Sequence, residues 1–181
     1  MARVPLIVSK DQVAPEHHAI VDSIIGSRGA LHGPFSVFLH SPEIAGRIAH
    51  LGALVRFEGT LPMRVRVLAA MVVAREFEAE YVWGAQTGSA RRQDVSETTI
   101  TAIRENNLTG VPPEDAMIIE YTSTLLRKHR IPAAMDKAMR DRFGNDQMTQ
   151  LTGAIGYYSM LAMTVNACEL EAGPGAEVLK V

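Results

Sequence analysis

Four residues that follow position 78 are spaced so that they could form one ligand-facing surface. Ala79, Val82, Trp83 and Gln86 are separated by three and four positions, which places them on one face of a helix. The amide of Gln86 can hold a ligand carbonyl or a water, but it cannot transfer protons near neutral pH. The alternative is that Gln86 satisfies buried backbone groups and that Trp83 packs in the core. We predict a ligand site on this face, with Gln86 supplying a neutral hydrogen bond.

Charged and polar side chains around this helix could contribute further chemistry. Arg75 follows a buried run and needs a partner, which is either a ligand carboxylate held through two hydrogen bonds or a structural partner: Glu78, Glu80 or another helix. Tyr81 and Trp83 offer an apolar wall with polar tips, which suits a small aromatic or lactone-like ligand. His40 precedes a helix start and can act there as an acid or base, or as a capping side chain. We predict His40, Glu80 and Tyr81 as the candidate proton-transfer groups.

Metal and cofactor motifs are not recognisable in the chain. The histidines lack a metal-ligand spacing such as His-x-x-x-His, and there is no phosphate-binding glycine loop and no nucleophile elbow. Cys168 is the single cysteine, which excludes an intrachain disulfide and a two-cysteine redox cycle. Its apolar surroundings predict a buried, inert thiol. We therefore expect no metal and no cofactor.

The helix that must position this site precedes it in the chain. Val67 to Ala74 is an unbroken run of small or apolar residues, which indicates a helix buried on nearly every side, with Pro62 at its start. Val67 on this helix would approach the ligand site. No segment alternates with period two for long enough to predict a sheet. Other helices are expected over 15–25 (ending near Gly26), 41–57, about 79–92, 112–129 and 132–143. Two more should begin at a cap, one at Asp94 or Ser96 and one at Asn145 or Asp146. The remaining segments are expected to be extended over 1–13, a loop or helical turn over 29–38 and irregular from Gly173.

The segment from Arg64 to Asn106 resembles the core motif of the carboxymuconolactone decarboxylase and alkylhydroperoxidase D-like family. The family's peroxidase branch carries a Cys-x-x-Cys, a His and a Glu, and these positions fall here on Ala79, Val82, Gln86 and Val67. The branch without cysteines reads Tyr-Glu-Trp-x-x-His, of which this chain keeps only the Tyr and the Trp. Further resemblance lies, in the family's order, in Leu31–Phe35, Leu39–Glu43, Val55–Glu58, Leu61–Pro62, Ile155–Tyr158 and Asn166–Ala167.

The resemblance implies an all-α, alkylhydroperoxidase D-like helical bundle as one domain over 1–181. It implies a cofactor-independent enzyme of lyase or isomerase type, acting on a small, largely apolar organic acid or lactone. The expected site then combines the proton-transfer candidates with Gln86 and with a lining of Trp83, Arg75, Val82, Val67 and Ala79. The alternative is a non-catalytic member that binds a small molecule or only assembles. Thiol peroxidase chemistry would lack its nucleophile.

Composition and charge bound the partners and the location. The net charge of −2 gives no reason to expect nucleic acid or an acidic membrane surface as a partner. The uncharged stretch Gln147–Cys168 is interrupted by polar residues and glycines, so a buried or interface helix is expected there rather than a membrane span. No signal peptide is recognisable, which favours the cytoplasm. The excess of apolar helix at Val67–Ala74 and Gly153–Cys168 predicts a homo-oligomer, and the resemblance implies a trimer or hexamer.

Overall fold

The structure, a computed structural model, describes residues 2–173 and 175–179. Within these ranges every regular element is helical, which confirms the all-α prediction. Short turns of 3₁₀ helix lie at Lys10–Gln12 and Pro15–His17, and a π-helical turn lies at Leu54–Glu58. The α-helices are α1 (His18–Arg28), α2 (Pro34–Phe38), α3 (Pro42–Ala53), α4 (Met63–Glu76), α5 (Glu80–Arg92), α6 (Glu97–Glu105), α7 (Pro113–Lys128) and α8 (Ala133–Ala167).

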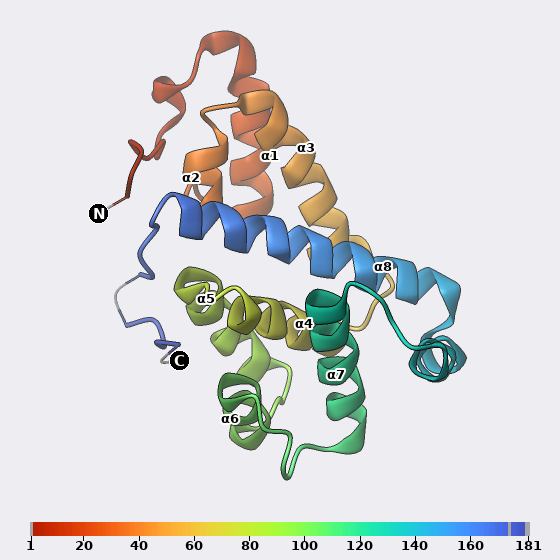
Figure 1. The fold of residues 1–181 in the computed structure, drawn as a ribbon. Helices are drawn as coiled ribbons and strands as arrows, with labels where there is room; N and C mark the ends of the chain where they lie inside the picture. Colours follow the sequence, from red (N-terminus) through yellow and green to blue (C-terminus); the bar gives the residue numbers. More distant parts are fainter. Residues whose placement is uncertain (1, 174, 180–181) are drawn as a thin grey trace.

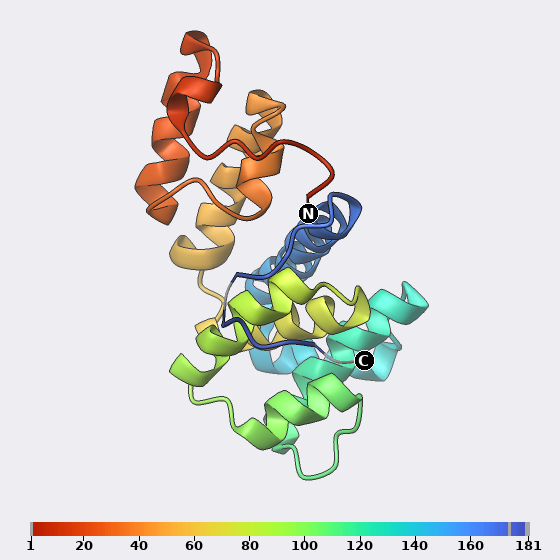
Figure 2. The same ribbon diagram turned by 90° about the vertical axis from the view of Figure 1, so that its left-hand side faces the viewer.

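The helices form two groups that the long helix α8 joins. Figure 1 shows α8 running across the molecule, with α1–α3 on one side of it and α4–α7 on the other. Figure 2 shows α1–α3 projecting from the rest as a lobe. Helix α4 packs against α5, α7 and α8, so it is the centre of the second group. A cavity at the junction of these groups would therefore be built by side chains far apart in sequence.

Helix α4 is buried along most of its length, as predicted from its apolar run. Every residue from Val65 to Ala74 is buried, so the helix makes contacts on all sides rather than along one stripe. Arg64 in its first turn forms an ion pair with Asp115 of α7, at 2.6 Å between Nη2 and Oδ2. The side chain of Asp115 is only 1% exposed. The first turn of α4 is therefore anchored to α7 by a pair that is largely out of water.

The end of α1 and the structure of the first residues differ from those predicted. Helix α1 continues through Gly26 to Arg28 and is capped at Gly29, whose φ of 83° lies in the left-handed region that favours glycine. Gly26 is an exposed residue within the helix and does not adopt a positive φ, so the helix does not end there. The segment predicted as extended over 1–13 contains the short turn at Lys10–Gln12.

Other boundaries follow the local signals in the sequence. Ser96 caps α6, because its hydroxyl accepts a hydrogen bond from the backbone N–H of Thr99. Gly144 has φ 68° and ψ 174°, a non-helical conformation that breaks α8 where two separate helices were predicted. The second part of α8 then runs from this break to Ala167 and carries the residues that face the site described below.

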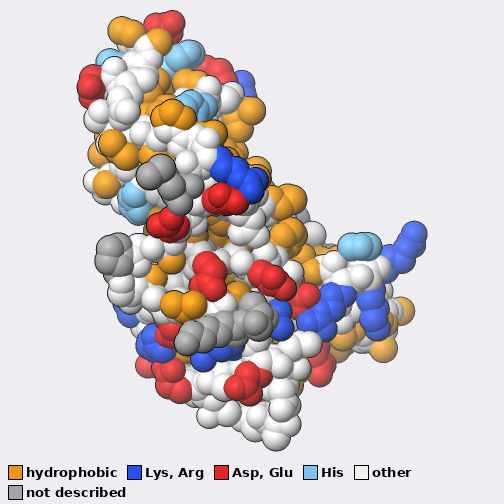
Figure 3. All heavy atoms as spheres, turned by 60° about the vertical axis from the view of Figure 1, so that its left-hand side comes forward, with side chains coloured by type: hydrophobic (Ala, Val, Ile, Leu, Met, Phe, Trp, Pro, Cys, Tyr) orange, Lys and Arg blue, Asp and Glu red, His pale blue; other side chains and the backbone are white. Residues whose placement is uncertain are grey.

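The surface separates charged from apolar side chains. Figure 3 shows charged side chains of both signs gathered over the α4–α7 group, and hydrophobic ones exposed mainly around the α1–α3 group. Exposed apolar side chains include Leu51, Leu54 and Phe57, at the end of α3 and in the π-helical turn. In the described part of the chain, no helix is long and apolar enough to cross a membrane.

Candidate functional site

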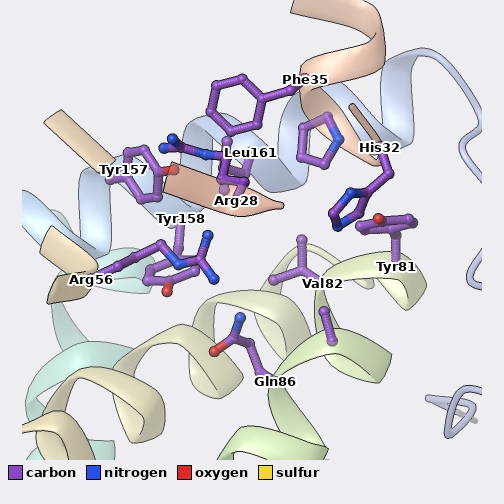
Figure 4. Close-up of a pocket in the computed structure, with 12 residues that line it drawn as sticks. Arg28, His32, Phe35, Arg56, Tyr81, Val82, Gln86, Tyr157, Tyr158 and Leu161 are labelled. Atoms are coloured by element: carbon purple, nitrogen blue, oxygen red, sulfur yellow. The ribbon is translucent and has the colours of Figure 1, made fainter. Parts of the chain in front are cut away.

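A cavity of about 140 Å³ lies where the two helix groups meet α8 (Figure 4). Its apolar wall comes from three places in the chain: Phe35 on α2, Val82 on α5 and Leu161 on α8. Phenol, guanidinium, imidazole and amide groups form the remaining wall. A cavity that combines an apolar wall with convergent polar groups is typical of small-molecule sites. The polar residues that line it are Arg28, His32, Arg56, Tyr81, Gln86, Tyr157 and Tyr158.

Gln86 carries an unpaired polar atom at this cavity. Its Oε1 is buried and has no hydrogen-bond partner among the described residues. Nearly all buried polar side-chain atoms in folded proteins do have a partner, so an orphaned one needs an explanation. Figure 4 shows the Gln86 side chain rising from α5 toward the cavity. In Figure 4 the amide nitrogen points up toward the cavity and the oxygen lies to its side, so this orientation offers a donor to a ligand, and a turn of the amide would offer the oxygen to a ligand N–H or O–H group.

Tyr81 closes one end of the cavity and depends on a glycine opposite. A Cβ added to Gly33 would lie 2.2 Å from the Tyr81 hydroxyl, so only glycine lets the loop before α2 approach the ring. Burial raises the pKa of Tyr81, which keeps its phenol neutral over a wider pH range. His32 lies beside Tyr81 at the same end (Figure 4). Its imidazole offers one donor and one acceptor nitrogen at this end of the cavity.

Two tyrosines of α8 form the opposite end. The rings of Tyr157 and Tyr158 contact edge to face, with centroids 5.3 Å apart and planes at 82°. Burial raises the pKa of Tyr157, and a hydrogen bond with Arg28 partly opposes that shift. The Arg28 guanidinium lies 4.2 Å from the centre of the Phe35 ring and donates to the carbonyl of Ala49 at 3.0 Å. Its Nε atom is buried without a partner, so the cavity wall contains an orphaned donor as well as the Gln86 acceptor.

A second hollow of about 210 Å³ adjoins the first across Gln86. Arg56 and Gln86 line both spaces, whereas Arg66 and Val67 line only the second. Arg66 is 6% exposed and donates from Nη1 to the Tyr158 hydroxyl at 3.0 Å. The phenol of Tyr158 therefore connects the first cavity to a buried guanidinium in the second.

Four of the site residues predicted from the sequence line the cavity or the hollow beside it. Tyr81, Val82 and Gln86 line the first cavity, and Val67 lines the second hollow. Ala79 and Trp83 are fully buried and lie outside both linings. Ala79 is the N-terminal capping residue of α5 and makes no side-chain capping hydrogen bond. The remaining three residues have other partners.

His40, Glu80 and Arg75 are each held away from the cavity. The exposed His40 forms a hydrogen bond through Nε2 with the carbonyl of Pro5, at 2.7 Å. Glu80 accepts a hydrogen bond from the backbone N–H of Leu179, at 2.8 Å. Arg75 donates from Nε to the carbonyl of Arg104, at 2.7 Å, and borders a different hollow between α4 and α6–α7. The expectation that these three residues gather around Gln86 is therefore corrected by the geometry.

The arginines and the α8 tyrosines of the site were not predicted from the sequence. Arg28, Arg56, Tyr157 and Tyr158 come from three segments that meet only in the folded chain. The one available signal was that Arg56 and the tyrosine pair fall within fragments resembling the family.

In the described residues, no group of three or more His, Cys, Asp or Glu side chains could hold a metal ion.

Comparison with known proteins identifies the fold. No family model matches this chain, and no curated protein matches it. Two solved structures are similar to it over nearly their whole length. The crystal structure of an alkylhydroperoxidase AhpD core, an uncharacterized peroxidase-related protein from Ralstonia eutropha JMP134, has a TM-score of 0.78 and 13% identity, and the match covers 96% of this chain and 93% of that one.

The second similar structure is an uncharacterized peroxidase-related protein from Silicibacter sp. TM1040. Its TM-score is 0.74 at 12% identity, and the match covers 99% of this chain and 98% of that one. These similarities show an AhpD-like helical fold for this chain, as the sequence resemblance implied. At such low sequence identity the similarity establishes only the fold, so any chemistry must be inferred from this chain's own residues.

Proposed function

We propose that this chain is a cofactor-independent enzyme of lyase or isomerase type that acts on a small, largely apolar organic acid or lactone in the cavity beside Gln86. The observation that carries the proposal is the buried, unpartnered Oε1 of Gln86 at a cavity whose lining includes an apolar wall of Phe35, Val82 and Leu161. A ligand with an aromatic-sized apolar body and one polar edge is complementary to such a site.

The candidate proton-transfer groups of this cavity are His32 and Tyr81, in place of His40 and Glu80. Both line the same end of the cavity, so a ligand bound against Gln86 would have its far edge near them. The neutral phenol of Tyr81 can donate a hydrogen bond to a carbonyl or enolate oxygen, while the imidazole of His32 removes or returns a proton. The site can thus support proton transfer without a metal or cofactor, in a protein that we expect to work in the cytoplasm.

A non-catalytic binding protein is the second candidate function, and one observation favours it. The positions that carry the peroxidase relay in the resembled family are apolar and buried here, at Val67, Ala79 and Val82. A protein that only binds its ligand would keep the cavity and would not need the residues of the peroxidase relay. Turnover of a bound acid or lactone distinguishes the two candidates, because only the enzyme changes the ligand.

The proposal is tested by the variant Gln86→Leu, which keeps the bulk of the side chain and removes its hydrogen bond. Benzoate and the aromatic lactone phthalide serve as probes, with binding measured by calorimetry or ligand-observed NMR. Loss of one neutral hydrogen bond should weaken binding of the better probe about three- to tenfold. The control is Gln147→Leu, since the Gln147 amide donates to the Thr60 carbonyl outside the cavity. Equal binding by wild type and Gln86→Leu would show that the site has been misplaced.

We further propose that the chain has no thiol-dependent peroxidase activity. Cys168 is half-buried at the end of α8 and is the single cysteine, so no second thiol can resolve a sulfenic acid. The assay is consumption of a hydroperoxide in the presence of a dithiol reductant. Turnover that is abolished in Cys168→Ser would contradict this expectation.

A further inference from the structure

The hollow beyond Gln86 is lined by arginines. Arg56 borders both spaces, and Arg66 and Arg92 border the second one beside the apolar side chain of Val67. Figure 4 shows the guanidinium of Arg56 extending toward the middle of the first cavity, above Gln86. A ligand that reaches past Gln86 would therefore meet positively charged groups at its far end.

These arginines differ from most others of the chain in having no acidic partner. Arg64, Arg91 and Arg127 each lie 2.5–2.6 Å from a carboxylate oxygen. By contrast, among the residues that the structure describes, the partner of Arg66 is the Tyr158 hydroxyl and that of Arg92 is the Ser89 hydroxyl, at 2.9 Å. Arg56 lies 4.8 Å from the centre of the Phe57 ring. None of these three arginines therefore forms an ion pair with a carboxylate among the described residues.

Burial makes this arrangement unfavourable unless an anion completes it. Arg66 is 6% exposed, and a guanidinium largely out of water needs a counter-charge as well as hydrogen bonds. Its hydroxyl partner supplies a hydrogen bond but no negative charge. Coulomb attraction is stronger near a protein interior than in water, so an anion at this place would interact strongly with Arg66 and Arg56 together.

We propose that Arg56 and Arg66 form a carboxylate subsite, which holds the ionised head of an organic acid whose apolar body lies in the cavity on the other side of Gln86. The planar guanidinium presents its N–H donors in a fork that matches the two oxygens of a carboxylate. The inference rests on the proposed function and narrows it: the ligand is an ionised acid and not a neutral lactone. It also assigns the anchoring role to these arginines and not to Arg75, which is bound to a backbone carbonyl.

The subsite is tested by calorimetry with benzoate, with its neutral isostere benzamide and with phenyl phosphate, on the full chain at low salt. Wild type should bind benzoate at least tenfold more tightly than benzamide, because a hydrogen bond to a charged group contributes more than a neutral one. Raising the salt concentration should weaken the binding of benzoate and leave that of benzamide unchanged.

Variants assign the effect to the arginines. Arg56→Met should weaken benzoate binding by roughly tenfold or more and leave benzamide binding unchanged. Because Arg66 is buried, Arg66→Lys is used there: it keeps the charge and loses the planar fork, and it should weaken benzoate binding by a smaller factor. The control Arg130→Met removes an exposed arginine outside both spaces and should leave binding unaltered. A thermal melt of each variant establishes that it is folded.

The outcomes separate this inference from the proposed function. If benzamide binds as well as benzoate, and Gln86→Leu weakens both, the proposed ligand site stands and the carboxylate subsite is refuted. If phenyl phosphate binds at least tenfold more tightly than benzoate, the assignment to a carboxylate is wrong. If no probe binds to wild type at millimolar concentration, the proposed function itself fails. Selective weakening of benzoate binding in Arg56→Met supports the subsite.

Discussion

Gly33 is the position where a single added methyl group should disturb the site most. Its φ is +58°, and a Cβ there would lie 2.2 Å from Oη, 2.6 Å from Cζ and 2.8 Å from Cε1 of Tyr81. Backbone strain at such a conformation costs about 1–3 kcal/mol. Overlap with a packed ring adds about 1–3 kcal/mol. We expect Gly33→Ala to lower the free energy of unfolding by about 2–6 kcal/mol in all.

Gly29 provides the matched control for this substitution. Its φ is +83°, also in the left-handed region, but a Cβ added there meets no atom within 4 Å. Gly29→Ala should therefore cost only the backbone strain, about 1–2 kcal/mol. Because ψ is −140° at Gly33 and −27° at Gly29, the difference between the two variants contains a difference in backbone strain as well as the overlap with Tyr81. The measurement is urea-induced unfolding followed by circular dichroism, with the transition midpoint compared at constant slope.

A third variant tests the cause of that difference. In a Tyr81→Leu background the phenol ring is absent, so Gly33→Ala should cost less than it does in the wild-type background, by the amount of the overlap. Because Tyr81 lines the cavity, Gly33→Ala should also weaken the binding of the benzoate probe while Gly29→Ala does not. If Gly33→Ala proves no more destabilising than Gly29→Ala, the close approach of the loop to the ring is wrong, and with it the shape of this end of the cavity.

Three further predictions concern stability and assembly. Asp115→Ala should destabilise the fold by about 3 kcal/mol in urea unfolding, since it leaves Arg64 without its carboxylate, and the double variant with Arg64→Ala should lose less than the two single losses combined. Burial raises the pKa of Tyr81 and of Tyr157 above 10.0, so the unfolded chain loses these protons at a lower pH than the folded one. The free energy of unfolding should therefore fall as the pH rises above about 10. The same pH dependence of unfolding in Tyr81→Phe as in wild type would contradict this. We propose a homo-oligomer, so light scattering should give a mass well above 19.7 kDa. Gly156 lies on an exposed part of α8, where an added Cβ meets no atom within 4 Å, so Gly156→Ala should weaken assembly. A stable monomer whose unfolding free energy rises by about 0.5–1 kcal/mol in this variant would refute the proposal.

The helices could be predicted from the sequence because their determinants are local. The apolar run of α4 has no polar face, so it could only be a buried helix, and Ser96 stands directly before the helix that it caps. Gly26 misled the prediction of the end of α1, because a glycine ends a helix only where the chain adopts a positive φ, and here that residue is Gly29. The composition of the segment does not decide between two nearby glycines.

The cavity was only partly predictable, because its two halves have different origins. Val82 and Gln86 lie one turn apart on α5, and helical spacing alone places them together. Arg28 and Arg56 reach the same cavity from helices whose relative positions depend on α8, which follows them by a hundred residues or so. The direction of Arg75 likewise depends on where α6 packs, since its partner is a backbone carbonyl there. Sequence spacing carries no information on such long-range approaches.

Contacts between the ends of the chain determine the order in which this fold can be completed during synthesis. The N–H of Arg3 donates to the carbonyl of Cys168 at 2.9 Å, and its side chain forms an ion pair with Glu169. Leu179, 2% exposed, donates to Glu80 at the start of α5. During synthesis, the segment around Arg3 therefore gains these partners only after Cys168 and Glu169 have been made. Helix α4 likewise stays uncovered on its α8 side until α8 has been made, so its apolar surface is exposed in the growing chain until then.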